Sequence, residues 1–413
     1  MFFRKVVSIL VASTMLLTGC AVGTGGSSNV KVGPQASSSY VKQAVEEEVV
    51  VAERPKLDII IPVFDPGLPE DPKDYKDEGI WPELRRAETS RFAYKLKSAI
   101  EETGVFGAVR VMPDTTATGD LYVVGKINES NGEEVDINIK VYDISGKQWF
   151  DKSFDHEVEE EFYINARNKG KDPYDPVFQQ AAERLVEELD DVKDKDLSQL
   201  QALTDLRFGA NFSEEAFSQY MKSDGDTVSL VGYPDEGDNM LKRVKSIRIR
   251  DQLFTDRMQP HYEQFSRKMD DSYLLWQKQS FDEISAAREA RNAAIGKAAA
   301  GVGLIALSVL AALAGASSNN VGGAVGGATA ATVAGAVGAG MLSESSTMSQ
   351  ESKFHKDALD ELGQSIDGEM APQVIEFDET TTKLTGSAKE QFAEWRAFLK
   401  SLYEQELTPD VQL

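Results

Sequence analysis

The stretch from Ala298 to Ser343 contains no ionisable side chain. Its first half, GVGLIALSVLAALAGA, is rich in aliphatic residues, whereas its second half, VGGAVGGATAATVAGAVGAG from Val321, has no side chain larger than that of valine. A polar turn, Ser317–Asn320, separates the halves. A glycine-rich helix costs roughly 1 kcal/mol per glycine relative to alanine in water, so it needs apolar surroundings. We therefore predict a Gly/Ala-rich helical hairpin over residues 294–343, embedded in a membrane or in an oligomeric core.

Small residues in the second half follow two adjacent rows with a spacing of four. The rows are Gly322, Gly326, Ala330, Ala334, Gly338 and Gly323, Gly327, Ala331, Gly335, Ala339. A helix face without side chains lets a neighbouring helix approach to backbone contact. The candidate helix-packing residues are Gly322, Gly323, Gly326, Gly327, Gly335 and Gly338. The alternative is a flexible linker, but such a linker requires neither the four-residue spacing nor the aliphatic first half.

This pattern resembles the glycine-zipper hairpin of a class of small outer-membrane lipoproteins. The resemblance implies self-association and a role in envelope integrity. In this chain the zipper lies inside a large protein, between two soluble segments, which departs from the usual pattern. Both ends of the hairpin should then lie on the same side, as expected for a periplasmic body.

The amino terminus, MFFRKVVSILVASTMLLTGC, has a basic start, an apolar run and then the only cysteine, Cys20. These are the features of a secretory signal over residues 1–19. Its ending, Leu17–Cys20, resembles the bacterial lipobox, which implies a covalent lipid (a palmitate-bearing anchor) on Cys20 and no other cofactor. The alternative is a plain signal peptide with an incidental cysteine. Because Ala21 follows, the resemblance implies the outer membrane, with the protein facing the periplasm.

Residues 20–55 are small, polar and finally acidic, as in a flexible tether. The chain of 413 residues carries a formal charge of −24, spread along its length. Nucleic acid and anionic lipid surfaces are therefore poor partners for the chain as a whole.

Residues 56–160 show the pattern of a small α/β layer domain. A β-branched run at 57–64 predicts a buried strand, and an apolar stripe over 83–102 predicts a helix that ends at Gly104. Strands are expected at 109–112 and 120–129, and the pair Asn131–Gly132 is typical of a tight hairpin. The next strand alternates apolar and polar residues from 135 to 142, and a last strand covers 148–154. The expected order is β-α-β-β-β-β.

Four segments resemble the domain shared by the amino-terminal part of the Tol-Pal protein TolB and the curli-secretion lipoprotein CsgG. They are IIIPVFDPG, SRFAYKLKSAIEETGVFGAVRV, GDLYVVGKI and VDINIKVYDISGKQWFDKSF. In that family the first strand ends in a Pro-Phe-like pair, whereas here Val63 separates Pro62 from Phe64. Gly104–Phe106 fits the family's entry to the second strand, and Asp143–Gly146 supplies the turn between the last strands. The resemblance covers about a quarter of the chain and implies the fold. No segment resembles the transmembrane hairpins of CsgG.

Residues 175–293 have an almost wholly helical pattern, typical of a set of long antiparallel helices. Ser213 is expected to cap a helix, and one apolar stripe ends near Pro260. A second stripe, from Tyr262 to Trp276, is typical of core rather than of a ligand site. A basic cluster favours a salt-bridged face over a phosphate or glycan contact; its residues are Lys242, Arg243, Lys245, Arg248 and Arg250.

Residues 350–413 predict a carboxy-terminal helical module that packs on the helical body. Helices are expected at 352–362 and 388–403, on either side of a strand pair at 374–377 and 382–384. The fold class is therefore α+β: a small α/β domain followed by a mainly helical domain with a Gly/Ala-rich hairpin.

No catalytic motif is present, and the three histidines, His156, His261 and His355, are far apart in the sequence. An EF-hand counted from Asp74 would place Lys76 and Arg85 at ligand positions, so the acidic loop at 71–78 does not predict a calcium site.

The leading hypothesis is a non-enzymatic outer-membrane lipoprotein with a structural or assembly role. It would associate with the lipid bilayer, with itself through the zipper, and with an envelope protein. The alternatives are an accessory lipoprotein of a secretion or polysaccharide-export system and a glycan-acting enzyme. The enzyme would need a deep cleft with a raised-pKa carboxylate.

Overall fold

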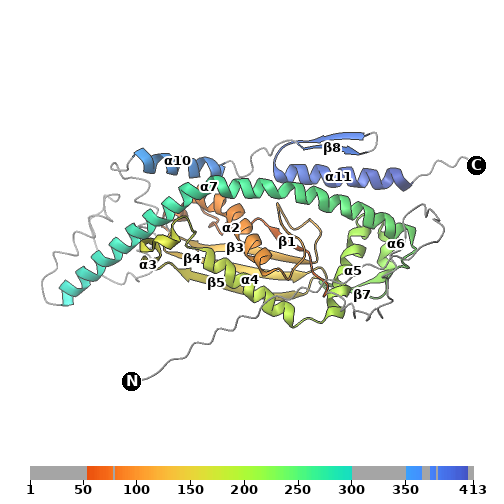
Figure 1. Ribbon diagram of the computed structural model, residues 1–413, viewed down its shortest axis with the longest axis horizontal. Helices are drawn as coiled ribbons and strands as arrows, with labels where there is room; N and C mark the ends of the chain where they lie inside the picture. Colours follow the sequence, from red (N-terminus) through yellow and green to blue (C-terminus); the bar gives the residue numbers. More distant parts are fainter. Residues whose placement is uncertain (1–53, 78–79, 300–349, 365–372, 378–379, 408–413) are drawn as a thin grey trace, which may run out of the picture. The chain divides into compact units, whose positions relative to one another are not determined.

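A five-stranded mixed sheet is the central layer of the computed structural model (Figure 1). The structure describes residues 54–77, 80–299, 350–364, 373–377 and 380–407, all within one compact unit, Arg54–Leu413. The strand order is β2-β1-β3-β4-β5, in which β1 pairs in parallel with β2 and β3, and β3, β4 and β5 form an antiparallel meander. The strands are β1 (Ile59–Pro62), β2 (Val109–Met112), β3 (Leu121–Ser130), β4 (Glu134–Asp143) and β5 (Gln148–Glu157).

The expected β-α-β-β-β-β order is confirmed. The apolar positions of β4 (Val135, Ile137, Ile139 and Val141) are buried, and the residues between them are partly exposed. Asn131–Gly132 connects β3 to β4 as predicted, with Gly132 at φ 97° and the Asn131 carboxamide accepting from two following backbone N–H groups. The chain is therefore a mixed α/β protein. The alternation of apolar and polar side chains predicted the sheet correctly.

Helix α2 (Pro82–Thr103) crosses the sheet between β1 and β2 and ends where the sequence predicts. Gly104 adopts φ 70°, and its backbone N–H closes the helix on the Glu101 carbonyl. α2 packs beside α4 (Asp175–Asp190), and the Phe92 and Phe178 rings meet edge to face at 5.2 Å. These two helices bury one face of the sheet in a core that includes Ile59, Ile61 and Ile137.

The opposite face of β1 and β2 is covered by helices from the second half of the chain. Ile60 and Met112 lie in a second core with apolar residues of α5 (Asp194–Ala210), α7 (Asn239–Ala299) and α11 (Ala388–Leu407). Successive residues of a strand point to opposite faces of a sheet, so β1 contributes to both cores. The α/β layer and the helical region thus share their hydrophobic interior.

The long helix α7 differs from the predicted set of antiparallel helices. It is a single helix of 61 residues that continues through Pro260. Proline in a helix interior removes one hydrogen bond and costs about 3 kcal/mol. Here Pro260 is exposed, while Phe254, Met258 and Tyr262 on either side of it are buried. Burial of one continuous apolar stripe outweighs that cost. The second stripe, to Trp276, is core as expected.

A short hairpin, β6 (Met221–Asp224) and β7 (Thr227–Leu230), interrupts the region that the sequence predicted to be almost wholly helical. Gly225–Asp226 forms its turn, with Gly225 at φ 61°. Ser213 precedes α6 (Glu214–Phe217) as expected, but its side chain makes no capping hydrogen bond, and that helix has only four residues. The remaining short helices are α1 (Asp74–Asp77), α3 (Glu160–Ile164), η1 (Ala166–Asn168) and η2 (Ser218–Tyr220).

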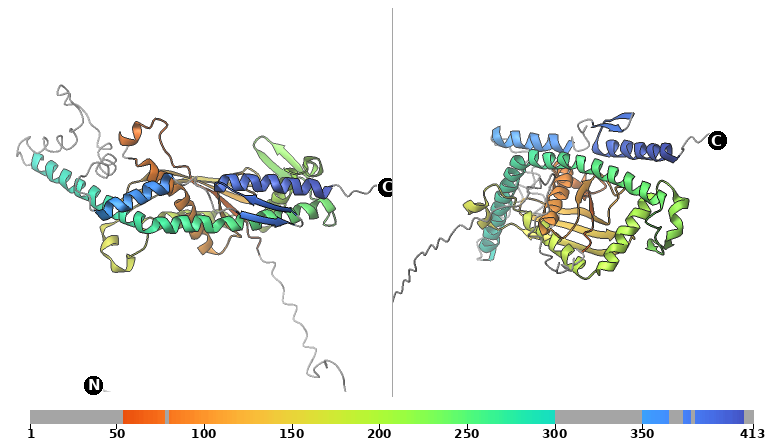
Figure 2. Two further views of the ribbon diagram at one scale, coloured as in Figure 1. Left: turned by 90° about the horizontal axis from the view of Figure 1, so that it is seen from above. Right: turned by 45° about the vertical axis from the view of Figure 1, so that its right-hand side comes forward.

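The carboxy-terminal elements follow the prediction. α10 (Gln350–Gln364) lies against α2 and α7, and the strand pair β8 (Gln373–Phe377) and β9 (Thr380–Leu384) precedes α11 (Figures 1 and 2). α11 packs on α7: the Trp395 and Phe254 rings stack at 4.7 Å, and the Trp395 indole donates to Asp251 Oδ1 over 3.0 Å. Expected apolar residues of α11 are buried, among them Phe392, Leu399 and Leu402.

The edge strand β2 is covered by a side chain of α7. The Gln259 carboxamide accepts from Val111 N (2.9 Å) and donates to Val111 O (3.1 Å). The side chain thereby forms the two hydrogen bonds that a neighbouring strand would otherwise form with this residue.

Replacing Gln259 with leucine should lower the free energy of unfolding by about 2–4 kcal/mol, because two backbone groups of a fully buried residue lose their partners. Denaturation with urea, followed by circular dichroism, measures the change. Gln264→Leu on the exposed side of the same helix is the control and should change the value by less than about 0.5 kcal/mol. Equal effects of both variants would contradict this role for Gln259.

Candidate functional site

The residues chosen from the sequence as functional lie outside the described residues. They are the lipidation candidate Cys20 and the helix-packing candidates Gly322, Gly323, Gly326, Gly327, Gly335 and Gly338. Of the predicted hairpin, 294–343, only its first residues are described, as the end of α7. Among the helices of the described chain, none combines the length and apolarity needed to cross a bilayer. The structure does describe the folded part of the chain that precedes and follows the uncharged segment, and the contacts within it are described below.

The two helices that flank the uncharged segment are held on the same part of the fold. α7 ends at Ala299 and α10 begins at Gln350, and α10 returns to α7 where His355 Nδ1 lies 2.9 Å from Ser272 Oγ. It also contacts α2, because the Trp81 indole donates to Asp360 Oδ1 over 2.7 Å. A Cβ on Gly363 would lie only 1.9 Å from the Glu83 carbonyl oxygen. This contact therefore requires glycine.

A buried guanidinium joins α2 to α7. Arg91 is 1% exposed and donates to Asp172 Oδ2 (2.8 Å), to Asp270 Oδ1 (2.5 Å) and to the Ser266 carbonyl (3.1 Å). Its guanidinium also lies 4.6 Å from the centre of the Tyr273 ring. Three of these partners belong to α7, so the charge fixes both the position and the rotation of that helix.

Asp172 is the second buried member of this network. Gln277 of α7 donates to its Oδ1 over 3.0 Å, and Lys95 of α2 lies 3.5 Å from its Oδ2. Burial alone would raise the pKa of Asp172, but the positive charges of Arg91 and Lys95 hold it below its usual value. The carboxylate is therefore charged inside the protein, and its charge is compensated.

Glu88, one helical turn before Arg91 on α2, extends the network to the β3–β4 hairpin. It is fully buried and accepts from Ser130 Oγ (2.5 Å) and Tyr273 OH (2.7 Å). Burial raises the pKa of Glu88 above its ordinary value, although the nearby Arg85 opposes the shift. On α7, Ser280 packs so closely on Gly132 that an added Cβ would lie 2.4 Å from its Cβ.

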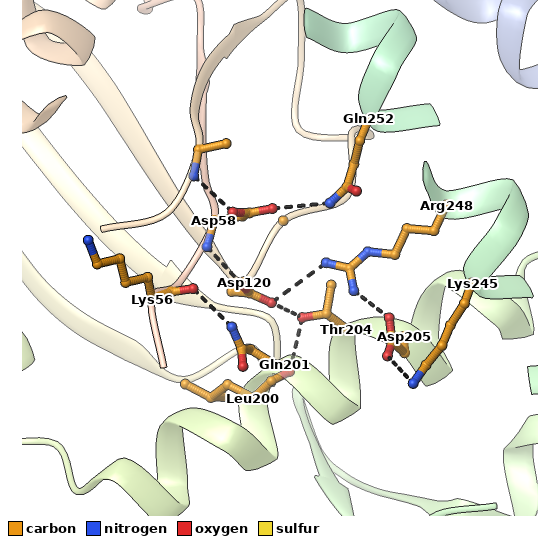
Figure 3. Close-up of polar contacts among 12 residues, drawn as sticks. Lys56, Asp58, Asp120, Leu200, Gln201, Thr204, Asp205, Lys245, Arg248 and Gln252 are labelled. Carbon is orange, nitrogen blue, oxygen red and sulfur yellow. Dashed lines mark hydrogen bonds and ion pairs between the residues drawn. The ribbon is translucent and has the colours of Figure 1, made fainter. Parts of the chain in front are cut away.

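A second polar network lies at the amino-terminal ends of β1 and β3, where α5 and α7 meet the sheet (Figure 3). Asp58 N donates to Asp120 Oδ2 (2.8 Å), and Thr204 Oγ1 of α5 donates to Asp120 Oδ1 (2.5 Å). The Asp58 side chain accepts from Ala108 N and from the Gln252 carboxamide of α7. Burial raises the pKa of Asp120, and its hydrogen bond from Thr204 opposes the shift.

Two residues of the predicted basic cluster on α7, Lys245 and Arg248, form ion pairs as expected for a salt-bridged face. Arg248 pairs with Asp205 of α5 and lies 3.9 Å from Asp120 (Figure 3). Lys245 approaches the same Asp205 carboxylate at 3.7 Å, and Arg243 donates to the Tyr403 carbonyl of α11 over 2.6 Å. These cations hold α5, α7 and α11 together.

The carboxylates of both networks have protein donors as partners, which favours a positioning role for them. Sequence reasoning missed Arg91, Asp172 and Glu88 because their partners are distant along the chain: 81 residues separate Arg91 from Asp172. The sequence signal for such a network is a charged residue on the buried apolar stripe of a predicted helix. Arg91 directly precedes Phe92 of the predicted stripe.

In the described part of the chain, no group of three or more His, Cys, Asp or Glu side chains is placed to hold a metal ion. His156, His261 and His355 belong to different elements. Asp71 and Asp74 in the acidic loop are exposed.

No protein-family model, curated protein or solved structure matches this chain.

Arg91→Met should lower the free energy of unfolding by about 3–5 kcal/mol, because Asp172 would remain charged and buried without its main partner. Urea denaturation measures the loss. Arg267→Met is a matched control on α7. That guanidinium is exposed, and among the described residues its ion pair is with Glu263 one turn away, so its loss should cost less than about 1 kcal/mol. If Arg91→Met were as mild as the control, the network would not position α7.

Proposed function

We propose that this protein is an outer-membrane-anchored lipoprotein with a structural or assembly role in the cell envelope. Cys20 carries the lipid, residues 20–55 form the tether, and residues 56–299 and 350–407 form a periplasmic body. The uncharged segment associates with the same segment of other copies through its glycine rows. No cofactor or catalytic activity is part of this proposal.

The observation that supports it best is the placement of α7 and α10. Both helices that flank the uncharged segment pack on α2, through Arg91 for α7 and through Trp81 and Gly363 for α10. A chain that leaves and returns to one body must reverse direction in between. This arrangement agrees with the two-helix hairpin that the polar turn Ser317–Asn320 predicts.

The resemblance to the TolB and CsgG domain remains a proposal for residues 56–160. The β-α-β-β-β-β order and the mixed sheet are compatible with it. In this proposal, acyl chains hold the protein to the membrane, the hairpin sets the oligomer geometry and the α/β layer presents a docking face to an envelope partner. A dedicated transporter recovered by crosslinking in cells would instead favour the accessory role in secretion or polysaccharide export.

Cys20→Ala should move the protein from the outer-membrane fraction to the soluble periplasmic or unprocessed pool, since no acyl chain can be attached. Membrane fractionation and metabolic labelling with palmitate measure the two effects. Ala21→Ser, which retains the cysteine, is the control and should remain labelled and membrane-bound. Labelling that survives Cys20→Ala would overturn the anchor.

Gly326→Leu combined with Gly335→Leu should abolish the oligomer, because each leucine separates the helix backbones that the rows bring together. Crosslinking in detergent followed by gel electrophoresis measures the oligomer. Ala328→Leu combined with Ala336→Leu introduces the same two leucine side chains outside both rows and should leave the oligomer in place. An unchanged oligomer in the glycine variant would refute the zipper.

A further inference from the structure

A cavity of about 300 Å³ lies where α5, α7 and α11 meet. Its apolar wall includes Phe208, Phe212 and Leu399, and its polar residues include Asp251, Arg396 and Lys400. Neither of the two polar networks described above contains this cavity. Its size is at the lower end of the range for small-molecule sites, so a ligand there has few heavy atoms.

Asp251 is a buried carboxyl group with one oxygen already occupied. It is 5% exposed, and its Oδ1 accepts the Trp395 indole N–H over 3.0 Å. Within the described residues its other oxygen, Oδ2, accepts no hydrogen bond. Arg396, Arg110 and Arg248 attract the Asp251 carboxylate electrostatically, but none of them forms a hydrogen bond with it. A buried carboxylate in this position is stabilised by a donor with a positive charge.

Arg396 and Lys400 supply the opposite charge from one face of α11, four residues apart. One Arg396 nitrogen donates to the Thr116 carbonyl, which leaves further N–H donors of the five on the guanidinium. Lys400 is exposed and forms no ion pair within the described chain. Both side chains line the cavity, so an anionic group has two cationic partners there.

We propose that this cavity binds a free α-amino acid with an apolar side chain. The ammonium group donates to Asp251, the carboxylate lies between Arg396 and Lys400, and the side chain packs against Phe208 and Phe212. An amino acid carries both charges on adjacent atoms with an apolar group beside them, which is the combination that the lining offers. The site is independent of the lipid anchor and of the zipper.

Burial agrees with this assignment. Desolvation raises the pKa of Asp251 in the free protein, and the hydrogen bond from Trp395 opposes the shift. A bound ammonium group would favour the ionised carboxylate. Binding should therefore release a proton from Asp251 where the free site holds one.

Isothermal titration calorimetry on the mature full-length chain in detergent tests the proposal with four probes. L-Phenylalanine and L-leucine should bind with a Kd between about 10 µM and 1 mM. 3-Phenylpropanoate, which lacks the ammonium group, and phenethylamine, which lacks the carboxylate, should each bind at least about tenfold more weakly than phenylalanine. If neither amino acid bound at a concentration tenfold above the weakest expected Kd of about 1 mM, the proposal would be overturned.

Variants assign the contacts. Asp251→Asn retains an acceptor for Trp395 but removes the charge, so it should weaken phenylalanine binding at least about tenfold while leaving 3-phenylpropanoate unaffected. Lys400→Gln should weaken phenylalanine and 3-phenylpropanoate alike. Lys389→Gln, on α11 and outside the cavity lining, is the control and should change neither.

The thermal unfolding midpoint of each variant without ligand shows whether it is folded. Should Asp251→Asn fail to fold, Lys400→Gln at the exposed rim still tests the carboxylate contact. Tight binding of 3-phenylpropanoate, equal to that of phenylalanine, would exclude the ammonium contact and overturn the proposal. Equal loss of binding in Lys389→Gln and Lys400→Gln would also overturn it.

Discussion

The ion pairs of Arg91 are the interaction on which the arrangement of this fold most depends. A guanidinium buried on α2 requires carboxylates at fixed positions. Asp270 of α7 and Asp172 of the loop before α4 supply them. Removing one partner of a buried ion pair costs far more than removing an exposed one. A shift of α7 by one residue would separate Arg91 from Asp270 and Ser266 together, so the network fixes the register of the longest helix against the sheet.

This register links both hydrophobic cores to the two ends of the uncharged segment. The amino-terminal half of α7 closes one face of the sheet with Phe254 and Met258, and its carboxy-terminal half joins α2 through Met269 and Tyr273. Gln259, between these two groups of residues, covers the edge of β2. One continuous helix therefore closes both cores and covers the edge strand.

The sheet was predictable from the sequence because local patterns determine it. Alternation in β4, the Asn131–Gly132 turn and the glycine that ends α2 each depend on neighbouring residues alone. Pro260 misled because it indicated a helix end, whereas burial of the apolar stripe on both sides of it dominates. The sequence prediction missed the β6–β7 hairpin, although its turn, Gly225–Asp226, is a hairpin signal. Arg91 and Asp251 required the fold itself, since their partners are 81 and 144 residues away.

The acidity of the chain bears on how copies of such a body would associate. A formal charge of −24 on 413 residues makes copies repel one another, and salt screens that repulsion only beyond about 10 Å at 0.1 M ionic strength. Within the body, carboxylates such as Asp172 and Asp205 are neutralised by arginines, which leaves the excess of negative charge on exposed residues. Attraction between copies then has to come from a surface without charge. The stretch from Ala298 to Ser343 is the longest run without charge in the sequence, and this is the physical reason why we propose self-association for that segment and not for the folded body.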